Sequence, residues 1–327
     1  MELLGPLKFV PLFKNKIWGG DKIKTILHHD FSPLPNCGEL WALSGIPGNE
    51  SIVSEGPLEG NTLNEVLEIY MSDLVGEEIY DRFENEFPLL IKFIDANDWL
   101  SVQVHPDDSL AEKRGLESGK TEMWYIMQAE EGANIIKGFS KKVSKEEYKT
   151  HLSNNTLDSV LNFAPVKAGD FFYIDAGKIH ALGPGILLTE IQQSSDTTYR
   201  IYDWDRKDNN GNGRQLHIEE ALDAIDFKAE TGNAIHYHHH KNESQAIVDE
   251  KYFTTNILEF DKPIEKDYNE VNSFIIYIVT SGSFILKGSQ GNMDLGIGDV
   301  VLLPATTTKI ELHPLPKAKI LEVYIKM

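Results

Sequence analysis

The chain has 327 residues, of which 41% are hydrophobic, so it is long enough for two domains that each bury a core. Its formal charge of −20 repels phosphate backbones and anionic lipid at long range, which argues against nucleic acid or a membrane surface as a partner. A small anionic substrate remains compatible with this charge if a few Lys or Arg side chains reverse the potential locally.

The N-terminal segment and the single cysteine bear on location. Pro6, Lys8, Pro11 and Lys14 interrupt the first apolar residues, so we expect neither a signal peptide nor a membrane span there. Cys37 has no partner for an internal disulfide. Both observations favour a reducing cytoplasm.

Three segments carry helical signals. Thr62 and Glu65 form a capping box before an apolar stripe that continues to about residue 83. A second capping box predicts a short helix over 145–152. Apolar residues at helical spacing predict a third helix over 217–225.

Elsewhere the chain consists of short β-runs separated by Gly, Pro, Asn and Asp. Their number and spacing predict a sandwich or barrel with helices added. The predicted strands are 89–94, 99–105, 123–128, 133–138, 171–174, 186–192, 252–260, 273–279, 283–287 and 300–303.

An internal repeat relates two groups of these strands. The aligned segments are 125–127 with 277–279, 132–139 with 282–289, and 166–182 with 295–312. In the last pair, Gly169–Asp170 lies over Gly298–Asp299, a tight turn followed by a strand that resembles the second motif of the cupin jelly roll. We therefore predict a mainly β protein with two cupin-type jelly-roll barrels and a helical insert in the N-terminal part.

The two copies differ at polar positions. The alignment places Glu122 over Phe274 and His180 over Lys309, so the second copy loses both potential ligands together. This pattern indicates that the chemistry belongs to the first copy. The second copy is interpreted as structural.

The repeat also sets the expected domain organisation. Residues 1–235 are predicted to form a catalytic cupin domain with helical segments at about 62–84 and 107–162. Residues 236–327 are predicted to form a degenerate, metal-free cupin-like β domain. The polar stretch near 228–250 supplies the boundary.

Four polar residues of the first copy are candidate metal ligands. Residues two apart in a strand share a face, so Gln103 and His105 point one way and the valines beside them point the other. With Glu122 and His180 they offer two imidazoles and two oxygen donors, which suit zinc or another divalent metal. The alternative is that each is a separately hydrogen-bonded polar residue.

A histidine-rich tract competes with this set. His236, His238, His239 and His240 lie close together, and such tracts can bind metals. They lie in a polar stretch without nearby carboxylate patterning, so we interpret them as part of a solvated linker.

Several segments, taken in order, resemble the type I phosphomannose isomerases (mannose-6-phosphate isomerases) in their short bacterial form. They are WGG at 18–20, GELWALSG at 38–45, SVQVHPDD at 101–108, GKTEMWY at 119–125, IHALGPG at 179–185 and EIQQSSDTTYRIYDWDR at 190–206. The resemblance implies a cupin-type fold and reversible conversion of mannose 6-phosphate to fructose 6-phosphate. It also implies one zinc ion per chain, held by Gln103, His105, Glu122 and His180.

Such an isomerisation moves a proton between C1 and C2 through an enediolate, which requires a base, a group that stabilises negative oxygen and a holder for the phosphate. Glu190 and Asp196 are the candidate acid or base groups; whether Glu190 or a zinc-bound water is the base stays open. Lys120 and Arg200 are candidates for stabilising the oxyanion or gripping the phosphate, and Arg206 is a further phosphate candidate.

The segment 200–206 departs from longer family members, which carry Arg-Ala-Gly-Leu-Thr-Pro-Lys where this chain has Arg-Ile-Tyr-Asp-Trp-Asp-Arg. Arg200 is retained. Arg206 restores a positive charge six residues on, but it can equally form a surface salt bridge with Asp203 or Asp205.

Other nearby residues have structural alternatives. Asp107 and Asp108 are predicted to cap a helix over Leu110. Trp18, Glu39 and Trp41 are candidates for lining the pocket, with core packing as the alternative for the tryptophans.

Two rival functions remain compatible with the sequence. A metal-dependent cupin oxygenase would use a similar ligand set, but it would prefer iron and would not need Lys120 and Arg200 in the cleft. A non-catalytic sugar-binding cupin would tolerate the loss of Glu190. The expected partner is a small sugar phosphate, and the oligomeric state is left open.

Overall fold

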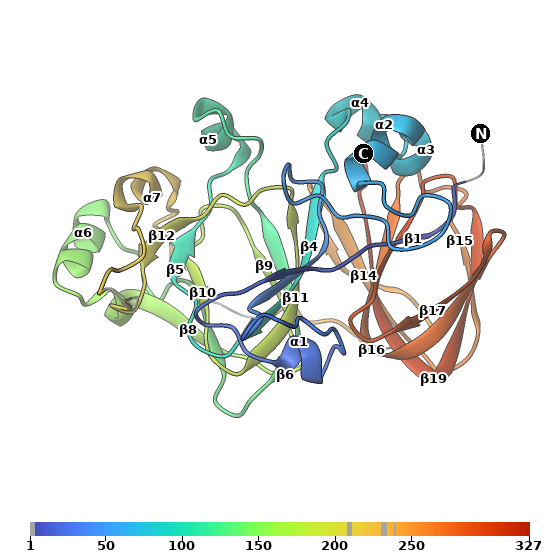
Figure 1. Ribbon diagram of the computed structural model, residues 1–327. Helices are drawn as coiled ribbons and strands as arrows, with labels where there is room; N and C mark the ends of the chain where they lie inside the picture. Colours follow the sequence, from blue (N-terminus) through green and yellow to red (C-terminus); the bar gives the residue numbers. More distant parts are fainter. Residues whose placement is uncertain (1–3, 208–210, 230–233, 239) are drawn as a thin grey trace.

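The structure is a computed structural model that describes residues 4–207, 211–229, 234–238 and 240–327. Its strands form sheets of eight, six and five strands. In Figure 1 the six- and five-stranded sheets occupy the left part of the molecule, and the strands of the C-terminal region lie beside them on the right. The prediction of a mainly β fold is confirmed.

The six- and five-stranded sheets contain the strands from the first two thirds of the chain. Their strand orders are β2-β3-β4-β11-β6-β9 and β12-β5-β10-β7-β8. The bounds are β2 Leu12–Lys14, β3 Glu39–Leu43, β4 Leu89–Ala96, β5 Val102–Val104, β6 Glu122–Ala129, β7 Asn134–Phe139, β8 Leu161–Pro165, β9 Phe171–Ile174, β10 His180–Leu182, β11 Ile186–Gln193 and β12 Tyr199–Tyr202.

The eight-stranded sheet joins both ends of the chain. Its order is β1-β18-β16-β19-β14-β13, with β15 on β19 and β17 on β16. The bounds are β1 Leu7–Lys8, β13 Gln245–Asp249, β14 Thr254–Phe260, β15 Ile264–Asp267, β16 Ile275–Gly288, β17 Gly291–Gly296, β18 Val300–Leu303 and β19 Lys309–Tyr324. β16 unites two strands that the sequence predicts separately, and β19 was not predicted.

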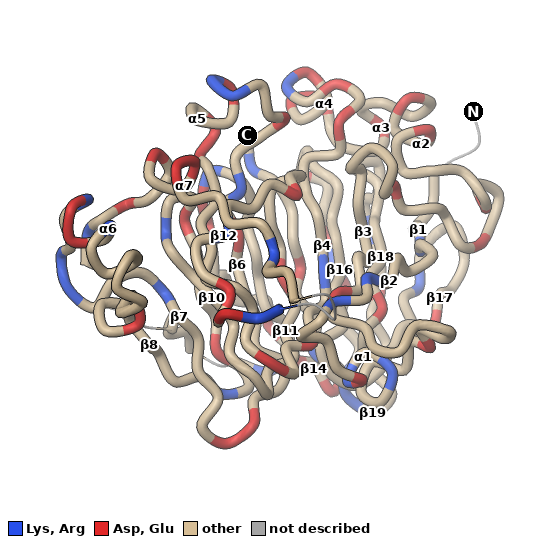
Figure 2. Tube along the Cα trace, turned by 60° about the vertical axis from the view of Figure 1, so that its left-hand side comes forward, with Lys and Arg blue, Asp and Glu red and all other residues tan. Residues whose placement is uncertain are grey.

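The helices are short and lie at the periphery, where α4, α6 and α7 carry part of the acidic charge (Figure 2). Their bounds are α1 Lys22–Thr25, α2 Leu63–Tyr70, α3 Ser72–Val75, α4 Glu77–Phe83, α5 Asp108–Lys113, α6 Lys145–Ser153, η1 Leu157–Val160 and α7 Ile218–Ala224. None of these helices, within the described parts of the chain, is long and apolar enough to cross a bilayer.

Two predicted helical regions differ from expectation. The region 62–84 is helical but divided into α2, α3 and α4, because Met71 and Gly76 both have positive φ (48° and 97°). The region 107–162 is helical only toward its ends, since β6 and β7 lie between α5 and α6. The described helical insert is therefore interrupted by sheet.

The internal repeat is present in the backbone hydrogen bonding. Gly169–Asp170 exchanges hydrogen bonds with Ile126 at 2.8 and 2.9 Å. Gly298–Asp299 makes the same pair with Val279, at 2.9 Å each. Both glycines have positive φ, 93° and 89°, which a residue without a Cβ adopts at little cost.

This pairing corrects the sequence alignment by one residue. Glu122 pairs with Ile174 across β6 and β9, and the equivalent position on β16, opposite Leu303, is Ile275 rather than Phe274. The error arises because both runs are continuously apolar, so a slip of one residue leaves the hydropathy match unchanged while it exchanges the faces of the strand. Ile275 is also apolar, so the second copy still lacks a carboxylate at this position.

The two parts of the molecule share a core. One cluster of buried side chains includes Met123 and Phe171 of the six-stranded sheet together with Ile257, Ile278 and Leu321 of the eight-stranded sheet. Each of these side chains is at most 2% exposed. Apolar burial across this boundary therefore joins the sheets that the repeat relates.

The two repeat glycines allow a matched stability test. An added Cβ at Gly169 meets no atom within 4 Å, so we expect Gly169→Ala to cost about 1–2 kcal/mol from positive φ alone. At Gly298 the Cβ would lie 2.9 Å from Leu27 Cβ and 3.0 Å from Leu27 O, so Gly298→Ala should cost more. Urea unfolding of both variants gives the comparison, and equal losses would contradict this reading of the Gly298 environment.

Candidate active site

A cavity of about 260 Å³ is lined by both the six- and five-stranded sheets. Strands β3, β4, β6 and β11 supply residues from the first sheet, and β5, β10 and β12 supply residues from the second. Its polar lining residues are Lys16, Glu39, Lys92, Ser101, Gln103, Lys120, His180, Glu190, Asp196, Thr198, Arg200 and Arg214.

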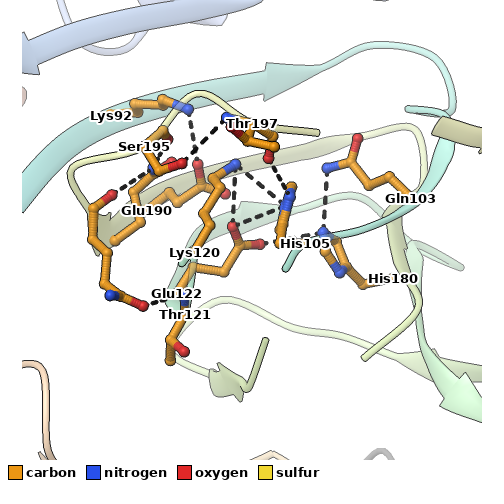
Figure 3. Close-up of polar contacts among 12 residues, drawn as sticks. Lys92, Gln103, His105, Lys120, Thr121, Glu122, His180, Glu190, Ser195 and Thr197 are labelled. Atoms are coloured by element: carbon orange, nitrogen blue, oxygen red, sulfur yellow. Dashed lines mark hydrogen bonds and ion pairs between the residues drawn. The ribbon is translucent and has the colours of Figure 1, made fainter. Parts of the chain in front are cut away.

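The strands bring the four candidate ligands together. Val102 and Val104 are buried in an apolar cluster, while Gln103 of the same strand lines the cavity, so the alternation expected for β5 is confirmed. Gln103 is the register partner of His180 on β10. Figure 3 shows the side chains of Gln103, His105, Glu122 and His180 directed toward one another.

Glu122 lies between the two imidazoles. Its Oε2 is 3.4 Å from His105 Nε2, and its Oε1 is 3.4 Å from His180 Nε2. The potential ligand atoms of these residues all lie within 4.8 Å of one another. Both Glu122 oxygens are buried and have no hydrogen-bond partner among the described residues; the Lys120 ammonium, 3.4 Å from Oε2, compensates the charge in part.

Backbone carbonyls fix the tautomer of each histidine. His105 Nδ1 lies 2.8 Å from Thr197 O, and His180 Nδ1 lies 2.9 Å from Lys178 O. A carbonyl only accepts, so each Nδ1–H donates to it, and the Nε2 lone pair faces Glu122. This is the orientation that a metal-binding imidazole requires.

The electrostatics give these side chains the protonation states of ligands. Burial, helped by Lys120, lowers the pKa of His105 to about 3, and burial also lowers the pKa of His180. Burial alone would raise the pKa of Glu122, but the Lys120 ammonium outweighs it and holds that pKa well below its usual range. Two neutral imidazoles and one carboxylate therefore fit a divalent cation.

Gln103 and Lys120 complete the surroundings of this group. Gln103 Nε2 lies 3.2 Å from His180 Nε2, and Gln103 Oε1 accepts a hydrogen bond from Ser101 Oγ at 3.4 Å. Lys120 Nζ lies 3.2 Å from His105 Nε2 and 3.4 Å from Glu122 Oε2. The Lys120 ammonium is thus beside the candidate metal site, and it is only 3% exposed.

Glu190 is held on the adjacent strand β11. Trp124 Nε1 donates to Glu190 Oε2 at 2.8 Å, and Lys92 Nζ lies 3.3 Å from Glu190 Oε1. Burial and the nearby Glu122 raise the pKa of Glu190 in spite of the lysines. A carboxyl of raised pKa that lines a cavity is suited to exchange a proton near neutral pH.

Arginines form a positive group at one side of the cavity. Arg200 and Arg214 line it, whereas Arg206 does not. Asp203 accepts from Arg206 Nη2 at 2.6 Å and from Arg214 Nε at 2.7 Å. Arg200 Nε is buried and has no hydrogen-bond partner within the described ranges; burial and the neighbouring Arg214 lower its pKa.

Other sequence candidates fall at the edge of this arrangement. Asp196 lines the cavity as an exposed side chain, and Trp18 and Glu39 also line it. In the histidine tract, His236, His238 and His240 are exposed, while His239 lies outside the described residues.

Sequence reasoning missed three cavity cations, Lys16, Lys92 and Arg214. Lys92 carried a usable signal, because a lysine within the apolar run 89–94 is costly to bury unless it is paired. It is 3% exposed and approaches both Glu190 and the ring of Trp41, 5.0 Å from the ring centroid. Arg214 had no such signal, since it follows a polar, Gly-rich stretch.

Comparisons with known proteins find relatives of one family. A family model described as the catalytic domain of type I phosphomannose isomerase matches residues 7–136. A mannose-6-phosphate isomerase of Streptococcus mutans is 45% identical over 67% of this chain and 67% of its own. The Bacillus subtilis protein YvyI is 37% identical over 92% of this chain and 93% of its own.

A solved structure is similar over nearly the whole chain. The mannose 6-phosphate isomerase from Bacillus subtilis superimposes with a TM-score of 0.84 and 33% identity, covering 98% of this chain and all of that one. A second structure, from Archaeoglobus fulgidus, has a TM-score of 0.80 at 23% identity and supports the fold alone.

The metal fit is tested by counting bound metal. We expect His180→Ala to lose most divalent metal after dialysis, because it removes a buried Nε2 ligand, whereas His238→Ala in the exposed tract should retain the wild-type content. Elemental analysis of both variants measures this. Metal loss from His238→Ala with retention in His180→Ala would place the site in the tract instead.

Proposed function

The chain belongs to the type I phosphomannose isomerases, and on that premise we propose that it interconverts mannose 6-phosphate and fructose 6-phosphate by proton transfer between C1 and C2. We further propose that it does so with one bound zinc ion. The proposed ligands are His105, Glu122 and His180. Gln103 is the proposed fourth ligand, with its amide turned so that Oε1 instead of Nε2 faces the ion.

The observation that carries this proposal is the buried Glu122 carboxylate, without a hydrogen-bond partner among the described residues, between two imidazoles that present Nε2 to it. Its donor set of nitrogen and oxygen is one that zinc accepts. Bound there, zinc would supply a Lewis acid that stabilises negative charge on the sugar oxygens.

Glu190 is the proposed proton carrier. The reaction needs a group that takes a proton from one carbon and returns it to the next, with a pKa near the working pH. Burial and Glu122 raise the pKa of Glu190, and hydrogen bonding to Trp124 fixes its orientation. Asp196, which is exposed at the cavity, is the proposed contact for substrate hydroxyls.

Lys120 is proposed to stabilise the enediolate. Its ammonium is buried beside the candidate ligands, where a positive charge acts with little screening by water. A negative charge that develops on a substrate oxygen at this point would be favoured relative to the neutral sugar. Lys120 therefore acts in the transition state as well as in substrate binding.

The phosphate is proposed to bind at the arginine group. Guanidinium pairs match phosphate oxygens with parallel hydrogen bonds, and Arg200 retains a buried Nε that no described residue accepts from. Arg214 lines the same cavity and is the proposed second contact. Arg206 is proposed to act indirectly, because it pairs with Asp203, the same carboxylate that binds Arg214.

The division into a catalytic part, 1–235, and a metal-free part, 236–327, remains our proposal. Among the described residues, the one group of three or more potential His, Cys, Asp or Glu ligands lies in the first part. An oxygenase or a passive sugar-binding protein is less well supported, because neither requires Lys120, Arg200 and Arg214 around one cavity.

The direct test is a coupled assay for fructose 6-phosphate formed from mannose 6-phosphate. We expect turnover with zinc-loaded protein, loss of at least 100-fold after a chelator, and recovery when zinc is returned. A protein that holds zinc but converts no substrate would contradict the proposal. Activity that survives complete metal removal would overturn the metal requirement alone.

The role of Glu190 predicts a pH effect. The base works only when deprotonated, so kcat should fall as the pH drops through the Glu190 pKa, and the raised pKa moves this acidic limb above that of an ordinary glutamate. Glu190→Gln should lower kcat by about 100-fold or more while retaining metal. A Gln variant with wild-type kcat and the same acidic limb would exclude Glu190 as the proton carrier.

A further inference from the structure

Asp107 and Asp108 lie at the N-terminus of α5, but their side chains make different hydrogen bonds. Asp107 accepts from Leu110 N at 2.8 Å and caps the helix, as expected from the sequence. The prediction that Asp108 is a second cap is wrong, because its side chain bonds to other segments. Asp108 is also not among the residues that line the cavity of about 260 Å³.

Asp108 connects the two parts of the molecule. Its Oδ1 accepts from Gly119 N at 3.2 Å and from Gln193 Nε2 at 2.9 Å. Its Oδ2 accepts from Tyr252 OH at 2.7 Å and from Lys251 Nζ at 3.1 Å. Lys251 and Tyr252 lie between β13 and β14 of the eight-stranded sheet, so one carboxylate receives donors from both parts.

The connection continues to the residues on either side of Lys120. Gln193 Oε1 accepts from Thr121 N at 2.8 Å, and Gln193 N donates to Thr121 O at 3.1 Å. Gly119 is bonded to Asp108 directly, and a Cβ at Gly119 would lie 2.6 Å from the backbone N of Asp108. The segment before β6 is therefore fixed at 119 and at 121.

We propose that Asp108 and Tyr252 are positioning residues for Lys120, so that the C-terminal part of the chain helps to set the geometry of the reaction. This inference rests on the proposed function. Lys120 reaches His105 and Glu122 through a flexible side chain, so the place of its ammonium depends on where its backbone is held. A displacement of about 1 Å at a reacting group can cost up to about 100-fold in rate.

The experiment removes single links of this connection. Tyr252→Phe deletes the hydroxyl and keeps the ring, and we expect kcat to fall about 3- to 10-fold. Asp108→Ala removes the shared acceptor, and we expect a fall of about 10- to 30-fold, while the double variant should be no slower than Asp108→Ala. KM and metal content should each remain close to wild type, while the thermal midpoint of Asp108→Ala should fall, because four donors lose their acceptor.

Two matched controls separate positioning from general damage. Tyr173→Phe removes a hydroxyl from the same boundary, where the Tyr173 ring lies 6.0 Å from that of Phe253, and Glu112→Ala removes an acidic side chain from α5. Both should keep wild-type kcat.

Three outcomes would each overturn the proposal. They are wild-type kcat in Tyr252→Phe and Asp108→Ala, a loss in the double variant equal to the product of the single losses, and a loss of kcat that follows metal content. An inactive wild-type protein would instead overturn the proposed function, and the positioning role with it.

Discussion

The arrangement of the site depends on one buried carboxylate. Glu122 is fully buried, its oxygens lack hydrogen-bond donors among the described residues, and it remains ionised because the Lys120 ammonium lies beside it. Lys120 compensates this charge only in part, and a cation bound between Glu122 and the two imidazole nitrogens would compensate it further. Two further features fit a cation site at this point. Backbone carbonyls orient both imidazoles toward Glu122, and the strand register sets Gln103 opposite His180.

The candidate site residues could be predicted from the sequence better than the strand register and the contacts between loops. Alternation in β5 was enough to place Gln103 at the cavity and Val102 and Val104 in the core, because a strand has only two faces. The internal repeat was identified, but the alignment of β6 with β16 was wrong by one residue. In a continuously apolar run, hydropathy does not distinguish one face of the strand from the other. Arg214 was missed, since its approach to Asp203 depends on how a polar loop folds back, and no local pattern encodes that contact.

One buried carboxylate of the first copy has a counterpart in the second copy. In the first copy Glu190 is the register partner of Trp124 and of Lys92; in the second, Glu322 is the partner of Tyr277 and of Asn256. Glu322 is 2% exposed, but Lys266 Nζ lies 2.7 Å from it and Tyr268 and Asn256 also bond to it. Glu322 is thus satisfied by the protein itself, as Glu190 is by Trp124 and Lys92. The position of Glu122 is occupied by Ile275 in the second copy, which fits the absence of a second metal cluster among the described residues.

The short strand β1 ties the beginning of the chain to the sheet built by its end. Leu7 and Lys8 pair with Leu302 and Val301, so the C-terminal sheet includes a strand that is made first. During translation, β1 cannot form these pairs until residues 301 and 302 have been synthesised, which is near the end of this sequence. A gene that lost the codons for the C-terminal sheet would therefore leave an unpaired N-terminal strand and an uncovered apolar face, which gives selection a reason to preserve that sheet even apart from any part it has in turnover.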